Sequence, residues 1–371
     1  MNKEPLVSER IRELVAYRPD EPLEELRRRL EVDEVLRLSS NENLFGPSPW
    51  AVEAIRQAAG AACYYPDGGG AGAMREAIAR FHDIDPAEII TANGSNEVIT
   101  LLARTFCERG EHSAVTFDYG FIIYALVCRG EGIKVRRVPV GEGFRLDTEA
   151  MLNAVDDTTR LAFIANPNNP TGTYVPADEM RDFLRKLPDH VIAVIDEAYV
   201  QYARADDYAS ALTMRDCHER LVVLRTFSKA HGLAGLRIGY GIGPAPLIEW
   251  MHRLREPFTC NGVAQAAAPA ALKDRDHVDH VVRRTEEGRR AFIDGLAELQ
   301  PAGVEFTPTQ ANFMLLHTPG DAQPVAHRMK QRGVLVRPMH GYGLPQSIRV
   351  AIVDRARMHR CIEALRTSLS A

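Results

Sequence analysis

Hydrophobic residues in the first two thirds of the chain form short runs, which alternate with longer stretches of helical periodicity. The runs cover residues 88–91, 113–117, 133–138, 160–165, 191–196, 221–226 and 236–241. Alternation of this kind is typical of an α/β sheet that is mostly parallel and carries helices on both faces. We therefore predict a large α/β domain over residues 37–255.

The last third of the chain has a different pattern. A long helical stretch starts near Val263 and runs toward Leu299, and shorter strand-like runs follow at 304–316, 334–337 and 348–353 before a terminal helix. This pattern predicts a smaller α+β domain. We assign residues 256–371 to it, together with an N-terminal arm of residues 1–36 that packs against it.

Two of the strand-like runs end in residues with a specific chemical use. Lys229 follows the run 221–226, and a lysine held at such a position can attack an aldehyde as a nucleophile. Asp196 ends the run 191–196, and a carboxylate there is costly unless it is paired. A protonated pyridine nitrogen is such a pair, so the two residues together point to pyridoxal phosphate (PLP).

Further residues suit the same cofactor. Tyr199 lies three residues after Asp196, and Asn169 lies in the turn NPNNPTG at 166–172. Both are placed to reach the ring's phenolic oxygen. The run TANGSNE at 91–97 opens a helix whose amides bind phosphate well, and Gly94, Ser95 and Asn96 are small enough to let it approach. Each motif alone also fits an ordinary turn, helix cap or surface lysine, but their combination predicts a PLP site. Phosphate-holding groups near the lysine are Thr226, Ser228 and Arg237.

In this order and spacing the motifs resemble fold-type I PLP enzymes, above all the histidinol-phosphate aminotransferase family. The resemblance extends from about Tyr17 to Val350. Runs that support it are LSSNENLFGPSP at 38–49, YPDG at 65–68, FSKAHGLAGLRIGY at 227–240, EPFTCNGVAQAAA at 256–268 and VLVRPMHGYGLP at 334–345.

The resemblance implies a role for each matching position. Lys229 is the lysine bound covalently to PLP, Asp196 the partner of the ring nitrogen, and Asn169 and Tyr199 the groups on the phenolic oxygen. Lys229, Asp196 and Tyr199 are thus the candidate catalytic residues. The phosphate cup implied by the resemblance consists of Ser95, Asn96, Thr226, Ser228 and Arg237.

Substrate binding and assembly follow from the same resemblance. Tyr65 matches a tyrosine that reaches the phosphate of the neighbouring subunit, which implies a homodimer with shared active sites. Arg349 matches the arginine that binds the acidic group of the substrate, and an arginine suits either a carboxylate or a phosphate. Side chains expected beside it are Tyr17, Asn43 and Arg337.

The chain departs from the family pattern at several positions. The run DYGF at 118–121 replaces the usual Glu-Pro-small-aromatic sequence, so either Phe121 or Tyr119 stacks on the PLP ring. His231 stands where tyrosine is usual and Leu44 where proline is common, and the residues after Arg349 lack the usual Gly-Thr-Glu pattern. These changes leave the cofactor chemistry intact and put the substrate in question.

The reaction implied by the resemblance is transfer of an amino group from histidinol phosphate to 2-oxoglutarate, in histidine biosynthesis. Three alternatives remain open. They are an aromatic or broad-specificity aminotransferase, a PLP decarboxylase resembling threonine-phosphate decarboxylase, and, remotely, a PLP-binding transcription regulator. The regulator requires a DNA-binding domain, and the residues before position 37 lack a helix-turn-helix pattern with a basic face.

Composition agrees with a globular enzyme and excludes other classes. The 371 residues are 45% hydrophobic and 26% charged, with a net charge of −5 that gives no reason to expect nucleic acid or an anionic membrane as partner. The six cysteines show no C-x-x-C spacing and the histidines no H-E-x-x-H, so we expect no metal site. With no apparent signal peptide or membrane-spanning run, we expect a cytoplasmic protein.

Overall fold

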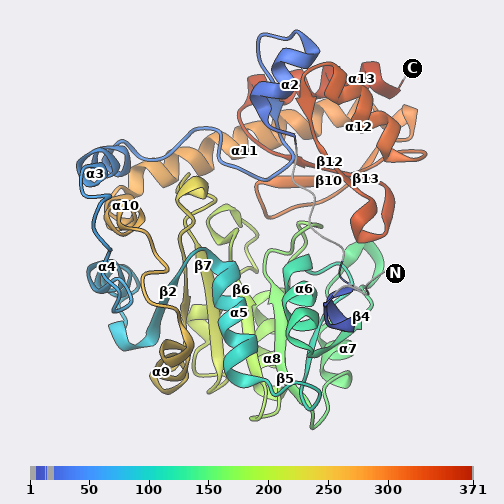
Figure 1. The fold of residues 1–371 in the computed structure, drawn as a ribbon. Helices are drawn as coiled ribbons and strands as arrows, with labels where there is room; N and C mark the ends of the chain where they lie inside the picture. The colour runs from blue at the N-terminus through green and yellow to red at the C-terminus, as the bar shows by residue number, and fades with distance from the viewer. Residues whose placement is uncertain (1–5, 13, 15–20, 370–371) are drawn as a thin grey trace, which may run out of the picture.

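A computed structural model describes residues 6–12, 14 and 21–369 of the chain. Its centre is a seven-stranded sheet in the order β2-β8-β7-β6-β5-β3-β4 (Figure 1). Strand β8 pairs antiparallel with both β7 and β2, and the other neighbours are parallel. The strands are β2 (Ile89–Ala92), β3 (Ser113–Phe117), β4 (Lys134–Val138), β5 (Thr159–Ala165), β6 (Ile192–Asp196), β7 (Leu221–Thr226) and β8 (Gly239–Ile242). The mostly parallel sheet predicted from the hydrophobic runs is confirmed.

Helices cover both faces of this sheet, and the alternation of side chains along the strands explains why. In β5, Leu161 and Phe163 pack toward one helical layer, whereas Ala162 and Ile164 pack toward the other. The first layer contains α5 (Ser95–Phe106), α6 (Ile122–Glu131) and α9 (Ala245–Leu254), and the second contains α7 (Thr148–Asn153) and α8 (Ala177–Lys186).

A second, four-stranded sheet has the order β12-β13-β10-β9 and lies above the first in Figure 1. Its apolar side shares one core with the helices around it. The strands are β9 (Glu305–Thr307), β10 (Phe313–His317), β12 (Arg337–Met339) and β13 (Leu344–Ala351), and the helices are α11 (Arg275–Ala297), α12 (Ala322–Gln331) and α13 (Arg355–Leu369).

The N-terminal arm divides between the two parts of the molecule. Helix α2 (Leu23–Leu30) lies beside the second sheet, and β1 (Leu36–Arg37) pairs with β11 (Val334–Leu335). Helix α1 (Glu9–Arg12) instead lies against α6, where Arg10 Nε donates to the carbonyl of Gly130 at 2.7 Å. The described parts of the N-terminal arm therefore contact both the second sheet and the large domain.

The long helical stretch expected after Val263 is broken in the structure. Helix α10 (Gly262–Lys273) ends at Asp274, whose backbone leaves the helical region and whose carboxylate caps the next helix, α11, by accepting from His277 N at 3.2 Å. Helix α10 packs on α3 (Pro49–Ala59) and α4 (Gly72–His82), at the β2–β8 side of the large sheet. Helix α10, which follows residue 256, thus packs beside the large sheet.

The described residues contain no helix that is long and apolar enough to cross a membrane. The same residues contain no group of three His, Cys, Asp or Glu side chains that would hold a metal ion.

Candidate active site

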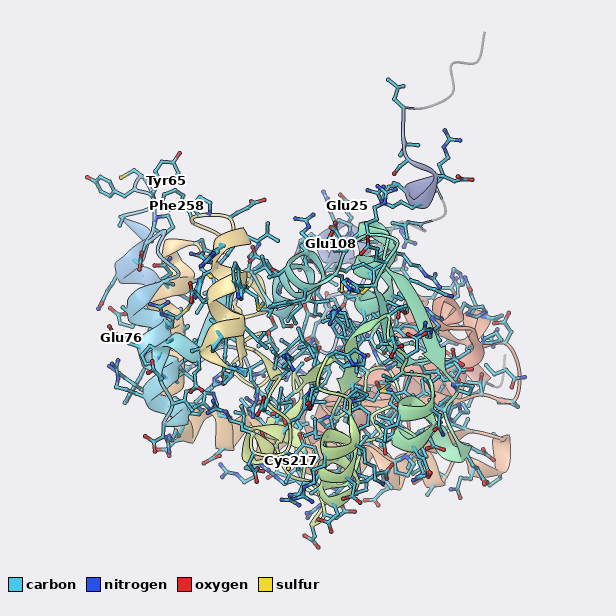
Figure 2. The ribbon with its side chains drawn as sticks, turned by 90° about the horizontal axis from the view of Figure 1, so that it is seen from below. Glu25, Tyr65, Glu76, Glu108, Cys217 and Phe258 are labelled. Carbon is cyan, nitrogen blue, oxygen red and sulfur yellow. The ribbon has the colours of Figure 1, made fainter. Side chains whose placement is uncertain are left out.

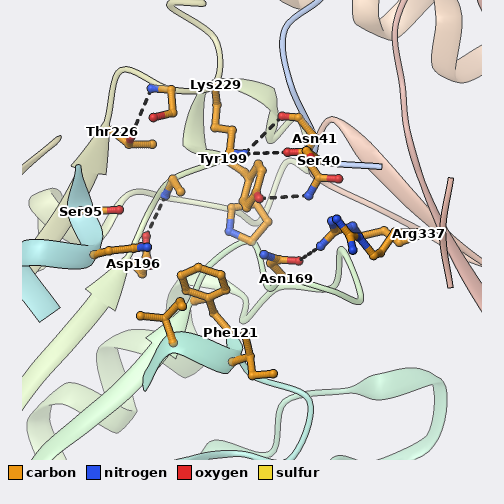
Figure 3. A pocket seen from close by; sticks show the side chains of 18 of the residues that line it. Ser40, Asn41, Ser95, Phe121, Asn169, Asp196, Tyr199, Thr226, Lys229 and Arg337 are labelled. Carbon is orange, nitrogen blue, oxygen red and sulfur yellow. Dashed lines mark hydrogen bonds between the residues drawn. The ribbon is translucent and has the colours of Figure 1, made fainter. Parts of the chain in front are cut away.

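Lys229 lies in the loop after β7 and points into a cavity of about 720 Å³ between the two sheets (Figure 3). Its Nζ lies 3.3 Å from the carbonyl oxygens of both Ser40 and Asn41. Burial, and then the positive charge of Arg349, lower the pKa of Lys229 to about 8. A lysine with a lowered pKa supplies the neutral amine that a nucleophile requires.

Asp196 is the last residue of β6, and its carboxylate is buried. Its Oδ2 accepts a hydrogen bond from the Tyr124 hydroxyl at 2.9 Å, and its Oδ1 accepts one from Ala198 N at 3.2 Å. Burial raises the pKa of Asp196 to about 6, and these two donors oppose that rise. A cationic group in the cavity would pair with this carboxylate.

Two polar groups lie between these residues and the second sheet. The Tyr199 hydroxyl accepts from Asn41 Nδ2 at 3.1 Å, so its own proton is directed elsewhere. Asn169 Oδ1 accepts from Arg349 Nη1 at 2.6 Å, so this amide donates through Nδ2. Both residues line the cavity, and both can therefore donate to an oxygen bound there.

The N-terminus of α5 forms one end of the cavity. Gly94 precedes it with φ 84°, and no side chain caps its first amides. A Cβ on Gly94 would lie 2.4 Å from Arg237 Nη2, so only glycine allows the arginine this close. Arg237 Nη1 also lies 3.3 Å from Ser228 Oγ. Uncapped helix amides beside an arginine and a hydroxyl bind phosphate.

Two arginines approach the cavity from the second sheet. Arg349 of β13 and Arg337 of β12 are directly opposite each other in the antiparallel ladder, so both side chains lie on one face. Arg349 is buried and donates from Nη2 to Ser39 O at 2.8 Å. In Figure 3, Arg337 and Asp196 lie on opposite sides of the cavity. The cavity thus has separate acidic and basic ends.

The structure brings most of the predicted residues together. Phe121 lines the cavity, whereas Tyr119 packs edge-on against Phe144, 5.4 Å between ring centres. The predicted residues among the cavity lining are Ser95, Asn96, Phe121, Asn169, Asp196, Tyr199, Thr226, Ser228, Lys229, Arg237, Arg337 and Arg349.

Gly94 adjoins the lining at the start of α5, and two other predicted residues, Asn43 and Tyr65, are not among the lining residues. Asn43 is not among the lining residues, because its Nδ2 donates to Ala230 O at 2.9 Å and holds the turn after β1. Tyr65 is 85% exposed on the surface, stacked on Phe258 (Figure 2). Tyr17 lies outside the described residues.

Sequence reasoning missed several groups at this site. Ser40 and Asn41 line the cavity, whereas Asn43 does not, and the hydroxyl of Tyr124 donates a hydrogen bond to Asp196. Tyr124 is three residues after Phe121, the N-cap of α6, and the spacing at the start of this helix brings the two rings together. That spacing was the signal for Tyr124. Which of Ser40, Asn41 and Asn43 faces the cavity depends on the conformation of a turn in which Asn41 has φ 55°.

The residues present fit PLP. An acidic group at one side suits the ring nitrogen, the donors Asn169 and Tyr199 suit the ring oxygen, and Lys229 suits the aldehyde. The uncapped amides of α5 suit the phosphate, and the start of β8 is packed tightly against them. A Cβ on Gly239 would lie 2.2 Å from Ser95 N.

Comparison with known proteins gives matches over almost the whole chain. The model of the family described as aminotransferase class I and II matches residues 33–365. A histidinol-phosphate aminotransferase of Akkermansia muciniphila is 41% identical over 100% of both chains, and one of Halalkalibacterium halodurans is 39% identical over 95% of this chain and 94% of its own. The crystal structure of histidinol-phosphate aminotransferase from Sinorhizobium meliloti, in complex with pyridoxal-5′-phosphate, has a TM-score of 0.86 at 28% identity and covers 100% of this chain and 99% of that one.

Fold and site together define a PLP-dependent aminotransferase of fold type I. The fold expected from the resemblance is confirmed. The chain belongs to the aminotransferase class I and II family and, within it, to the histidinol-phosphate aminotransferases.

Proposed function

We propose that this enzyme transfers the amino group of histidinol phosphate to 2-oxoglutarate, as a step of histidine biosynthesis in the cytoplasm. The observation that carries this proposal is the pair Arg349 and Arg337, which meet at one side of a cavity that also contains Lys229. Guanidinium groups bind carboxylate and phosphate in the same forked geometry. One site can therefore bind a phosphate-bearing amine and a dicarboxylic keto acid in turn.

Each residue has a definite task in this proposal. PLP, when bound, supplies an electron sink for negative charge on the substrate carbon. Asp196 would pair with the protonated ring nitrogen, and Tyr199 and Asn169 would donate to the ring oxygen. Lys229 Nζ would hold the cofactor and, as a free amine, would move a proton at the reacting carbon of the substrate. Phe121 would pack against the ring, and the phosphate would be held by Ser95, Asn96, Thr226, Ser228 and Arg237, with Gly94 leaving room for it.

We also propose that the enzyme is a homodimer with shared active sites. Tyr65 and its neighbour Tyr64 are exposed by 85% and 77%, and neither lines the cavity of its own chain. Large exposed aromatic residues mark contact surfaces. In a dimer, Tyr65 would donate to the phosphate bound by the partner subunit, the role that the family resemblance implies.

An aromatic amino acid is a second candidate substrate. The cavity wall contributed by α6 and the end of β12 contains apolar side chains, with Ile122, Leu126 and Met339 among them. Such a wall accepts an aromatic ring as well as an imidazole, so specificity depends on what the arginines bind.

A comparison of half-reactions tests the proposal. The purified holoenzyme is mixed in turn with histidinol phosphate, phenylalanine, tyrosine, glutamate and threonine phosphate, and the visible band of the lysine-bound cofactor is followed. We expect histidinol phosphate to give a larger kcat/KM than phenylalanine. A ratio below one would favour the aromatic aminotransferase, and release of carbon dioxide from threonine phosphate would favour the decarboxylase.

A further inference from the structure

The hydroxyl of Tyr124 lies behind Asp196, on the side away from the cavity lining. Its oxygen is 2.9 Å from Asp196 Oδ2, and Tyr124 itself does not line the cavity. Both side chains are almost completely buried, at 1% and 4% exposure. Water therefore cannot replace this hydrogen bond, and its loss would leave a carboxylate oxygen buried without that donor.

Two aromatic rings fix the direction of the Tyr124 hydroxyl. Phe163 of β5 stacks on the Tyr124 ring at 4.8 Å with an interplanar angle of 9°. Phe121, the N-cap residue of α6, meets the same ring edge-on at 5.6 Å. A buried ring packed against two others has little rotamer freedom, so the hydroxyl stays aimed at the carboxylate.

The proton in this hydrogen bond belongs to Tyr124. A carboxylate only accepts, and burial together with the charge of Asp196 raises the pKa of the Tyr124 phenol well above its ordinary value. Other charged or titratable groups that act on Asp196 are Glu197, the residue just after β6, which disfavours its charged form, and Lys229, which favours it. Tyr199 also faces Asp196 from the loop after β6.

From this geometry we propose that Tyr124 is a positioning residue for the reaction, which keeps Asp196 ionised and aimed at the nitrogen of the cofactor ring. The inference rests on the cofactor placement proposed above. Without the Tyr124 hydroxyl, only the amide of Ala198 and the distant charge of Lys229 oppose the effect of burial on Asp196. A protonated Asp196 cannot pair with a protonated ring nitrogen, so PLP would be held less tightly.

Tyr124→Phe removes the hydroxyl and keeps the stacked ring. Tyr202→Phe is its matched control, because the Tyr202 ring is equally buried at 1% exposure and its hydroxyl has no hydrogen-bond partner among the described residues. Each holoenzyme is diluted at a series of pH values between about 5 and 9, and PLP release and the visible spectrum are recorded together with the melting temperature.

For Tyr124→Phe we expect PLP retention to weaken about tenfold near neutral pH, the effect of one hydrogen bond to a charged group. We also expect the acid limb of the retention profile, the pH range in which PLP is lost as the solution becomes more acidic, to move up by roughly one pH unit. Tyr202→Phe should match the wild type in both. The proposal is overturned if Tyr124→Phe changes neither PLP retention nor its acid limb. It is also overturned if retention weakens but the acid limb does not shift, whatever the melting temperature does. A wild-type protein that does not retain PLP would instead refute the cofactor placement.

Discussion

Arg349 Nη1 donates to Asn169 Oδ1 at 2.6 Å and so joins the four-stranded sheet to the turn after β5. The same guanidinium donates from Nη2 to Ser39 O. A substrate anion that binds Arg349 must share or replace these bonds. Anion binding at Arg349 is therefore coupled to the position of the Asn169 amide, for which we propose contact with the ring oxygen.

Substitution of Arg349 should impair both half-reactions, because the keto acid and the phosphate substrate use the same guanidinium. Loss of a buried arginine partner costs about 2–5 kcal/mol, so Arg349→Gln should lower kcat/KM at least about 30-fold for histidinol phosphate and for glutamate. Arg337→Gln is the matched variant from the neighbouring strand, and it should impair the phosphate substrate. Measured kcat/KM values for both substrates check this. A loss confined to one substrate in Arg349→Gln would contradict the shared-site proposal.

The attachment of PLP should identify the reactive lysine, and the pH dependence of its rate should report the pKa of that lysine. Borohydride reduction of the holoenzyme should leave the label on Lys229, as peptide mass spectrometry would show, and Lys229→Ala should bind PLP without turnover. The neutral amine is the attacking form and the pKa of Lys229 is lowered to about 8. The attachment rate should therefore rise about tenfold per pH unit below that value and level off above it.

Arg349→Gln offers a check on the cause of that lowered pKa. Burial is the first cause and the positive charge of Arg349 the second. Removal of the charge should raise the pKa of Lys229 and move the rising limb to higher pH. A limb that stays in place would mean that Arg349 does not contribute to the lowered pKa of Lys229.

The central strands and the edge that carries the site could be predicted from sequence, because β5, β6 and β7 are short, largely buried apolar runs and the proposed site residues lie at or just after their ends. Asp196 and Lys229 follow neighbouring strands, and parallel strands bring their carboxyl ends to one edge. Which residues of the segment 40–43 line the cavity could not be predicted. Their directions depend on the turn in which Asn41 has φ 55°, and the amino-acid types in this segment do not indicate that conformation.

The helix break at Asp274 and the place of α10 were also beyond sequence reasoning. Periodicity continues on both sides of Asp274, so a capping aspartate is indistinguishable from an ordinary helical one until its backbone is known. Helix α10 is rich in alanine, which suits close packing on any neighbour. The contact of α10 with α3 and α4 is determined by tertiary packing, which the hydrophobic pattern of α10 does not specify.

His231 should make the protein sensitive to acid. Its burial, then the charges of His277 and Arg225, lower its pKa to about 4, whereas the unfolded value is 6.5. Between these values the unfolded chain binds a proton that the folded chain does not, so stability falls as pH drops from about 6.5 to 4. The full loss is on the order of 3 kcal/mol.

Replacement of His231 by the tyrosine usual in the family should remove this share of the acid sensitivity. Melting temperatures at pH 7.5 and 5 should differ less for His231→Tyr than for the wild type. His359 is exposed, and His359→Gln should leave that difference unchanged. Equal differences in His231→Tyr and the wild type would assign the sensitivity to other groups.

Tyr65 should act in the active site of the partner subunit. It is 85% exposed in its own chain, where its ring stacks on Phe258 at 4.9 Å and not on any residue of the cavity. Tyr65→Phe should weaken PLP retention by roughly 1 kcal/mol, the net contribution of one hydrogen bond. Size-exclusion chromatography with light scattering should give the mass of a dimer, and a fully active monomer would refute the shared site.

Mixed dimers give the sharper measurement. Tyr65→Ala and Lys229→Ala subunits are each expected to have low activity at limiting PLP, the second because it has no nucleophile. If Tyr65 serves the partner, each mixed dimer has one intact site and one site with both defects. Equal amounts of the two subunits form mixed dimers in half of the pairings, so activity should recover to about a quarter of the wild-type value. If Tyr65 served its own subunit, each site of the mixed dimer would carry one defect, and mixing would restore nothing.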